Sequence, residues 1–146
     1  MHDCIKLSVV DAVATALGTV TELAEVHMNE SVQRKREEYE HPVCFVNCYD
    51  TEELQHSNRV ERAIFPMIVE IWAEGSAVQR TLENLRASVR KALYASSALR
   101  TLGAACRERR AEHLVFEDTD TAGMIRVEYQ VQYHTNSVDP FSLVGF

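Results

Sequence analysis

Glycine and proline are scarce in this sequence, with five glycines and three prolines among 146 residues. It contains no glycine-rich phosphate loop and no G-x-S-x-G turn, and H-E-x-x-H and paired C-x-x-C motifs are also missing. The common signatures of nucleotide binding, serine hydrolysis and zinc binding are therefore absent. We accordingly expect no cofactor, no metal and no enzymatic activity.

Long apolar runs are missing too, and none approaches the roughly 18 residues that a membrane-spanning helix needs. The first residues lack the basic start and apolar stretch of a secretory signal. We expect a protein that folds in a cytoplasm and has no membrane partner.

Basic residues are the minority charge, with 15 Lys and Arg against 22 Asp and Glu, a net charge of −7. Because neutralisation of phosphates by basic residues supplies most non-specific affinity for nucleic acid, this balance opposes such binding. The two short basic clusters, residues 34–36 and 107–110, lie beside or among glutamates, which is typical of solvated faces.

The remaining composition is that of an ordinary globular protein, with 46% hydrophobic and 25% charged residues. Residues 1–146 are therefore predicted to form a single domain. Two stripes of apolar residues at three- and four-residue steps predict helices over residues 5 to about 25 and 77 to about 94. Asp3 and Ser76 are the expected caps.

Four segments predict strands: residues 42–50, 63–75, 113–120 and 123–135. In the last, Val127, Tyr129, Val131 and Tyr133 alternate with polar residues, although a typical strand has only about five or six residues. Pro66 cannot donate to a ladder, which indicates an edge position or a bulge. The polar segments 27–41 and 103–112 are interpreted as connections, and the polar segment 50–62 is too mixed to assign.

The order helix, strand, strand, helix, strand, strand predicts an α+β fold. A mostly antiparallel four-stranded sheet would carry the two main helices on one face, and the last two strands would pair as a hairpin through residues 121–123. The other face of the sheet would then be open to a partner.

Several polar side chains have more than one interpretation. Glu70 lies either on the solvent side of the sheet or beside a cation such as Arg126. The acidic cluster Glu117, Asp118 and Asp120 fits turn chemistry better than a cation site.

Cys44 and Cys48 lie about 13 Å apart if they share a strand, too far for a disulfide, and are interpreted as core residues. If they are exposed, Cys4 and Cys106 could crosslink neighbouring chains. A Cys106 nucleophile with a distant histidine can also be drawn, but such a pairing can be drawn in almost any sequence.

Three segments carry a resemblance to a known family: "VEIWAEG" at the end of the apolar strand, "RTLENLRASVRKAL" in the second helix, and "IRVEYQVQYHT" followed by "DPF". With the order of elements around them, they resemble the tail terminator, or tail completion, proteins of long-tailed bacteriophages. The resemblance covers nearly the whole chain and rests on element order and strand character.

The resemblance implies a structural virion protein at the tail-neck junction, assembled in the host cytoplasm. It implies a hexameric ring that caps the tail tube, ends its polymerisation and joins the tail to the head-neck. The implied partners are further copies of the chain, the tail tube protein and a neck or head-completion protein. DNA would pass through without specific binding, and the candidates for an acidic lumen are Glu70, Glu117, Asp118 and Asp120.

A ring needs a heterologous contact between subunits. We expect the far end of the long strand and the extension at residues 136–146 to reach a neighbour. The candidate interface residues are Tyr129, Val131, Tyr133, His134, Pro140, Phe141, Leu143 and Phe146, and Cys4 and Cys106 are candidates for a disulfide between subunits.

Two alternatives stay open. A head-completion or adaptor protein of the phage neck would also form a ring. A small α+β ligand-binding domain or enzyme would instead use the open sheet face as a pocket, with a deep cavity and strongly shifted pKa values.

Overall fold

The computed structural model describes residues 4–29, 38–48, 52–57, 59–115, 121–136 and 138–143. Along the chain its elements are α1 (Ile5–Gly18), β1 (Glu25–Met28), β2 (Val43–Cys48), β3 (Glu53–Ser57), β4 (Val60–Glu74), α2 (Val78–Tyr94), α3 (Ser97–Thr101), β5 (Ala105–Val115) and β6 (Ala122–Asn136).

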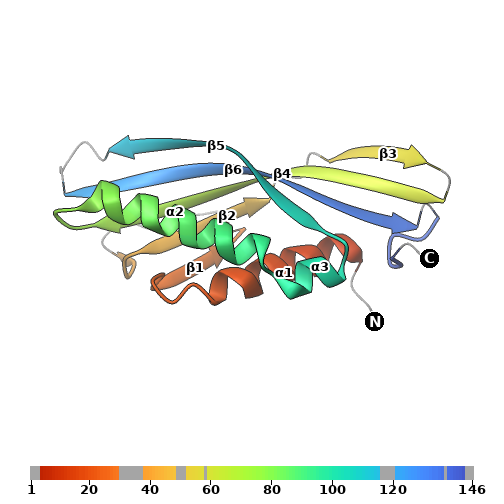
Figure 1. Ribbon diagram of the computed structural model, residues 1–146, viewed down its shortest axis with the longest axis horizontal. Coiled ribbons are helices and arrows are strands. Elements are labelled where there is room, and N and C mark those ends of the chain that lie inside the picture. The colour runs from red at the N-terminus through yellow and green to blue at the C-terminus, as the bar shows by residue number, and fades with distance from the viewer. Residues whose placement is uncertain are drawn as a thin grey trace.

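The strands form one six-stranded sheet in the order β1-β2-β4-β6-β5, and β3 pairs with the first part of β4 (Figure 1). Only β1 and β2 are parallel; the other pairs are antiparallel. The predicted α+β class and mostly antiparallel sheet are confirmed, as is the hairpin of the last two strands. The predicted number of four strands is wrong.

β3 lies in the unassigned polar segment 50–62, and β1 runs from the predicted end of the first helix into the predicted connection 27–41. β1 has only four residues and β3 five, so neither is long enough to show a clear apolar alternation. β5 begins at Ala105, well before the predicted start at residue 113, because its charged residues belong to the strand. Ala122 and Gly123, predicted as part of a turn, already belong to β6.

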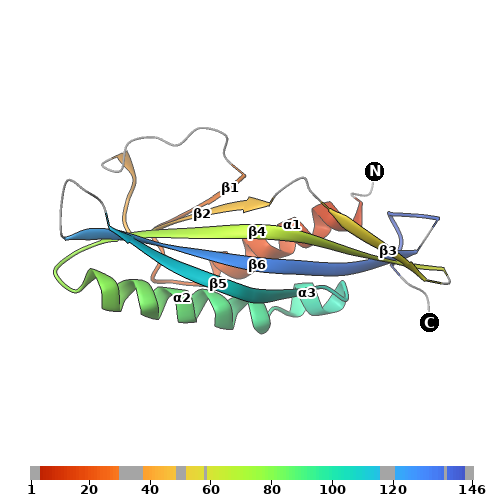
Figure 2. The ribbon, with the colours of Figure 1, turned by 90° about the horizontal axis from the view of Figure 1, so that it is seen from above.

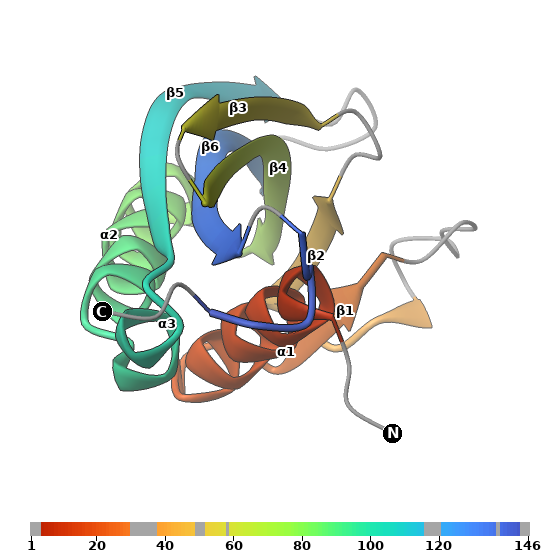
Figure 3. The ribbon, with the colours of Figure 1, turned by 90° about the vertical axis from the view of Figure 1, so that its right-hand side faces the viewer.

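The main core lies between the helices and one face of the sheet. Figures 1 and 3 show α1, α2 and the short α3 on the same side of the twisted sheet. The two predicted stripes supply the buried helix residues, which include Ile5, Val9, Val13 and Leu17 in α1 and Val78, Leu82, Leu85, Val89 and Leu93 in α2.

Helix ends differ from the predictions. α1 stops at Gly18, several residues before the predicted end, although Val20 and Leu23 beyond it remain buried. The N-cap of α2 is Ala77, which makes no side-chain cap, so the prediction of Ser76 is wrong. Asp3 lies outside the described residues. No helix among the described residues is both long and apolar enough to span a membrane.

β4 and β6 are 15 residues long and pair over their whole length, from Val60 opposite Asn136 to Glu74 opposite Ala122. On the other edge of β4, β3 pairs with residues 60–64 and β2 with residues 67–72. Phe65 and Pro66 fall between these two partners, so Pro66 occupies a local edge position, as predicted.

One end of the sheet projects beyond the helical layer. Figures 1 and 2 show that β3, the start of β4 and the end of β6 extend past the ends of α1 and α3. We call this three-stranded projection the arm. Because the pairing of β5 with β6 stops at Gln132, residues 133–136 of β6 have a strand on one side only among the described residues.

A charged contact joins β5 to α2 on the helix-covered face. The Glu108 side chain, only 8% exposed, accepts a hydrogen bond of 2.8 Å from Nε of Arg86 and a second bond from Nη2. Arg90 Nη1 lies 3.6 Å from Oε2 of Glu108, and the Glu108 backbone N–H donates to the Tyr94 hydroxyl at 3.1 Å. Glu108 therefore links the edge strand β5 to α2 through these contacts.

We expect Glu108→Ala to lower the free energy of unfolding by about 1.5–3 kcal/mol, because it removes charge-assisted hydrogen bonds to Arg86. Urea denaturation measures the change. Glu112→Ala is the matched control, since Glu112 is exposed on the same strand, and should change stability by less than about 0.5 kcal/mol. Equal effects of the two substitutions would contradict this role of Glu108.

Candidate functional site

The sheet face turned away from α1 and α2, here called the open face, is the candidate functional surface. One end of it is closed by an apolar cluster of Tyr39, Val43, Phe45 and Trp72 with Met124 packed against it. The Phe45 and Trp72 ring centroids are 4.7 Å apart, and Tyr39 meets Phe45 edge to face at 5.0 Å. The accessible part of the open face therefore lies nearer the arm.

Both predictions for Glu70 hold, since it lies on the solvent side of the sheet and beside Arg126. It lies on the open face directly opposite Arg126, whose Nε and Nη2 donate to Oε2 at 3.1 and 3.0 Å. Trp72 Nε1 donates to the other carboxylate oxygen at 3.3 Å. Because Arg126 offsets its charge, Glu70 adds little negative potential to an acidic surface. The other lumen candidates, Glu117, Asp118 and Asp120, lie outside the described residues.

A bulge in β5 changes the direction of its arginines. The register shifts between Glu108, opposite Tyr129, and Arg110, opposite Glu128, so one extra residue is accommodated. Arg110 Nε lies 2.7 Å from Glu128 Oε2, and Arg109 Nη1 donates to Gln130 Oε1 at 2.7 Å. Glu128 and Gln130 lie on the open face, so the bulge brings two consecutive guanidinium groups to that face.

A groove of about 240 Å³ lies in the middle of the open face, beside the gap between β3 and β2. We define the groove by six of its lining residues: Glu53, Ile64, Pro66, Arg109, Glu128 and Gln130. Ile64 and Pro66 are its apolar lining. Arg109 hydrogen-bonds the neutral amide of Gln130 and makes no ion pair with a carboxylate among the described residues.

Residues 138–143, here called the C-terminal turn, fold back on the helix-covered side of the sheet. The Ile5 N–H at the start of α1 donates to Pro140 O at 3.1 Å, and the Asn136 N–H donates to Ser142 O at 3.0 Å. Asp139 accepts from the Ser142 hydroxyl at 2.6 Å and from the Phe141 N–H at 3.0 Å, which lowers its pKa. The carboxylate thus shapes the turn and stays ionised.

The apolar side chains of the C-terminal turn are exposed. Val138 is 88% exposed, Phe141 54% and Leu143 40%. Together they form an apolar surface on a segment that is held by backbone hydrogen bonds to α1 and β6, which is the kind of surface that meets a partner.

The predicted interface residues divide into two groups. Tyr129, Val131 and Tyr133 are buried in the core of the same chain, because odd-numbered β6 residues face the helices, so their side chains offer no contact surface. This corrects their selection as interface residues. His134 is half-buried on the open face, and Pro140, Phe141 and Leu143 are exposed. Phe146 lies outside the described residues.

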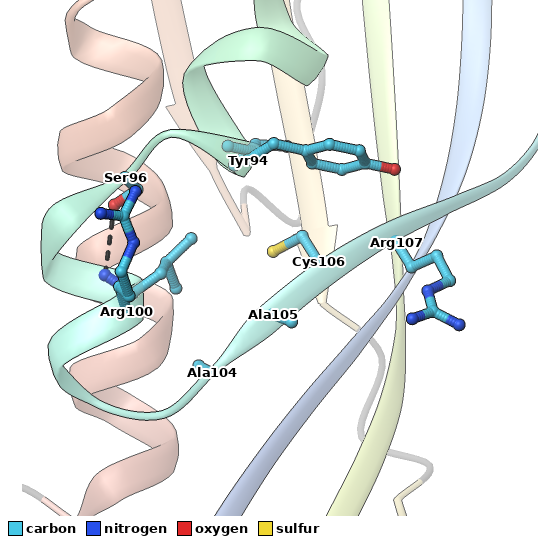
Figure 4. Close-up of a pocket in the computed structure, with 9 residues that line it drawn as sticks. Tyr94, Ser96, Arg100, Ala104, Ala105, Cys106 and Arg107 are labelled. Carbon is cyan, nitrogen blue, oxygen red and sulfur yellow. Dashed lines mark hydrogen bonds between the residues drawn. The ribbon is translucent and has the colours of Figure 1, made fainter.

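A second cavity, of about 300 Å³, lies between α2, α3 and the start of β5 (Figure 4). Tyr94, Arg100 and Cys106 help to line it, and Figure 4 shows the Arg107 side chain directed away from Tyr94. Burial raises the pKa of Cys106 to about 12, and no histidine is among the residues lining this cavity. Among the described residues that line this cavity, Cys106 therefore has no histidine beside it.

Clusters of metal-binding side chains are not found either: within the described ranges, no three His, Cys, Asp or Glu residues are grouped to hold a metal ion.

All four cysteines are free. Cys44 is buried, and Cys48 is half-buried and packed against the core, as predicted for core residues. Cys106 is only 6% exposed, so the exposure that a Cys4–Cys106 crosslink between chains requires is missing at Cys106. Burial raises the pKa of Cys44 to about 12 and that of Cys48 to about 11.

We expect thiol alkylation of the native protein at pH 8 to modify Cys4 first. The thiolate is the reactive form, and at pH 8 Cys44, Cys48 and Cys106 are almost entirely protonated because their pKa values are raised. Peptide mass spectrometry after timed labelling measures the order, and labelling in urea is the control that exposes all four. Native labelling of Cys106 as fast as that of Cys4 would contradict the prediction.

Comparison of the chain with known protein families and with curated proteins returns no match.

Proposed function

We propose that this chain is a ring-forming structural subunit of a long-tailed phage, acting as a tail terminator. The observation that carries the proposal is the combination, in one subunit, of a sheet open on one face with an exposed apolar turn on the opposite, helix-covered side. Two different surfaces on opposite sides are what a head-to-tail contact between identical chains needs.

The arm supports the same proposal. Its strands continue past the helices, and beyond Gln132 β5 no longer pairs with β6. At Asn136 the C-terminal turn occupies this edge, so among the described residues the edge without a strand partner is that of residues 133–135. A strand edge of this kind is a template for pairing with another chain. The length of β6 then has a reason, since its far end serves the assembly as well as the fold.

In this proposal the ring caps the tail tube, ends its polymerisation and joins the tail to a neck or head-completion protein at the tail-neck junction of the virion. The partners are further copies of this chain, six in a ring, and the tail tube protein. DNA passes through the ring, and the net charge of −7 disfavours its adhesion to the wall. The subunit is structural and has no catalytic role.

Negative-stain imaging of the purified chain, alone and mixed with tail tubes, tests the proposal. We expect rings, or density that caps tube ends. A chain shortened to end at Val138 is the comparison: it loses the backbone bonds of Pro140 and Ser142 to the body, should remain folded by circular dichroism, and should no longer assemble. Compact single particles of the full chain that ignore tubes would overturn the proposal, and binding to neck components without tube capping would indicate an adaptor.

A further inference from the structure

The exposed ring of Phe141 and the groove on the open face are complementary in several respects. Phe141 is 54% exposed at the tip of a turn that is held to α1 on the helix-covered side. The groove lies on the other side of the sheet, with Ile64 and Pro66 in its wall. Because the sheet separates the two, the Phe141 ring of one chain cannot enter its own groove.

Size supports the match. A cavity of about 150 Å³ suffices to hold a benzene ring in a protein interior, and the groove has about 240 Å³. A pocket for a drug-sized ligand is typically about 300–1,000 Å³. The groove is therefore better suited to one aromatic side chain than to a free small molecule.

The charges of the C-terminal turn and of the groove are also complementary. Asp139, two residues before Phe141, is ionised and lies within the same turn. In the groove, Glu128 is already paired with Arg110, whereas Arg109 is bonded only to the neutral Gln130. Glu53 lies on the β3 side, so an incoming Asp139 is favoured on the β5 side, beside Arg109.

We infer that the C-terminal turn of one copy docks on the open face of the next, with Phe141 inserted between Ile64 and Pro66 and Asp139 beside Arg109. The occupant of the groove is thus a second copy of this chain. The inference rests on the proposed ring, and it names the two surfaces that form the contact. Because donor and acceptor lie on opposite sides of the subunit, the contact repeats from copy to copy and closes a ring or continues as a filament.

Crosslinking between two differently labelled copies tests the contact without tail tubes. One copy carries Phe141→Cys, the other carries Ile64→Cys, and both carry Cys4→Ser to remove the half-exposed native thiol. Mild oxidation of the concentrated mixture should give a dimer on a non-reducing gel. The control partner carries Tyr94→Cys, which is similarly exposed but lies on the helix-covered side, and should give none.

Point variants test the same contact in assembly. Phe141→Ser should raise the concentration needed for rings or tube capping at least about tenfold, as expected for an aromatic anchor. Leu7→Ser, at a similarly exposed apolar residue of α1 outside the turn, should have little effect. Arg109→Glu should weaken assembly, and Arg107→Glu, the same charge change on the same strand but outside the groove, should not.

The outcomes separate this inference from the proposed function. If the wild-type chain caps tubes but Phe141→Cys and Ile64→Cys do not crosslink, the docking contact is wrong and the tail role stands. If the pair crosslinks and the wild-type chain ignores tubes, the contact stands and the tail role fails. Equal crosslinking to Tyr94→Cys, or equal loss of assembly in Leu7→Ser, also overturns the docking contact.

Discussion

β4 and β6 pair residue for residue over 15 positions, and the rest of the structure is arranged around that ladder. Since side chains alternate across a strand, one register decides the face of every residue in both strands. In the observed register Phe65, Met67, Tyr129 and Val131 all turn toward the helices. A slip of one residue would move this set to the open face and bring charged residues such as Glu128 into the core.

The neighbouring strands pair with the outer edges of β4 and β6. β2 and β3 divide one edge of β4 between them, and the gap at Phe65 and Pro66 forms part of the groove. β5 covers the edge of β6 only as far as Gln132, which leaves the end of β6 in the arm. β5 is an edge strand that carries charged side chains and a bulge, and both features disfavour non-specific pairing with a strand of another chain. The edges thus differ in how available they are to another chain.

Charge is distributed according to the same two faces. Glu108 points toward α2 and meets arginines there, whereas Arg109 and Arg110 point to the open face and meet Gln130 and Glu128. On the open face Glu128 and Glu70 are each paired with an arginine, so neither leaves an unpaired negative charge there. The one buried hydroxyl without a hydrogen-bond partner among the described residues is that of Tyr129, and burial, followed by the charge of Glu108, raises its pKa.

Local periodicity alone determined the α+β class, the core stripes of α1 and α2, the antiparallel hairpin of β5 and β6, and the faces of the long strand, because each of these depends on residues close in sequence. The start of β5 gave no apolar alternation, because its helix-facing residue Glu108 is charged and pairs with Arg86 on α2. Only the tertiary structure decided that Tyr129, Val131 and Tyr133 are core residues rather than contact residues. It also decided that Glu70 meets Arg126, that Cys106 is buried, and that Phe141 and the groove lie on opposite sides of the sheet. Each of these depends on which distant segments pack together, and packing between segments far apart in the chain leaves no local pattern in the sequence.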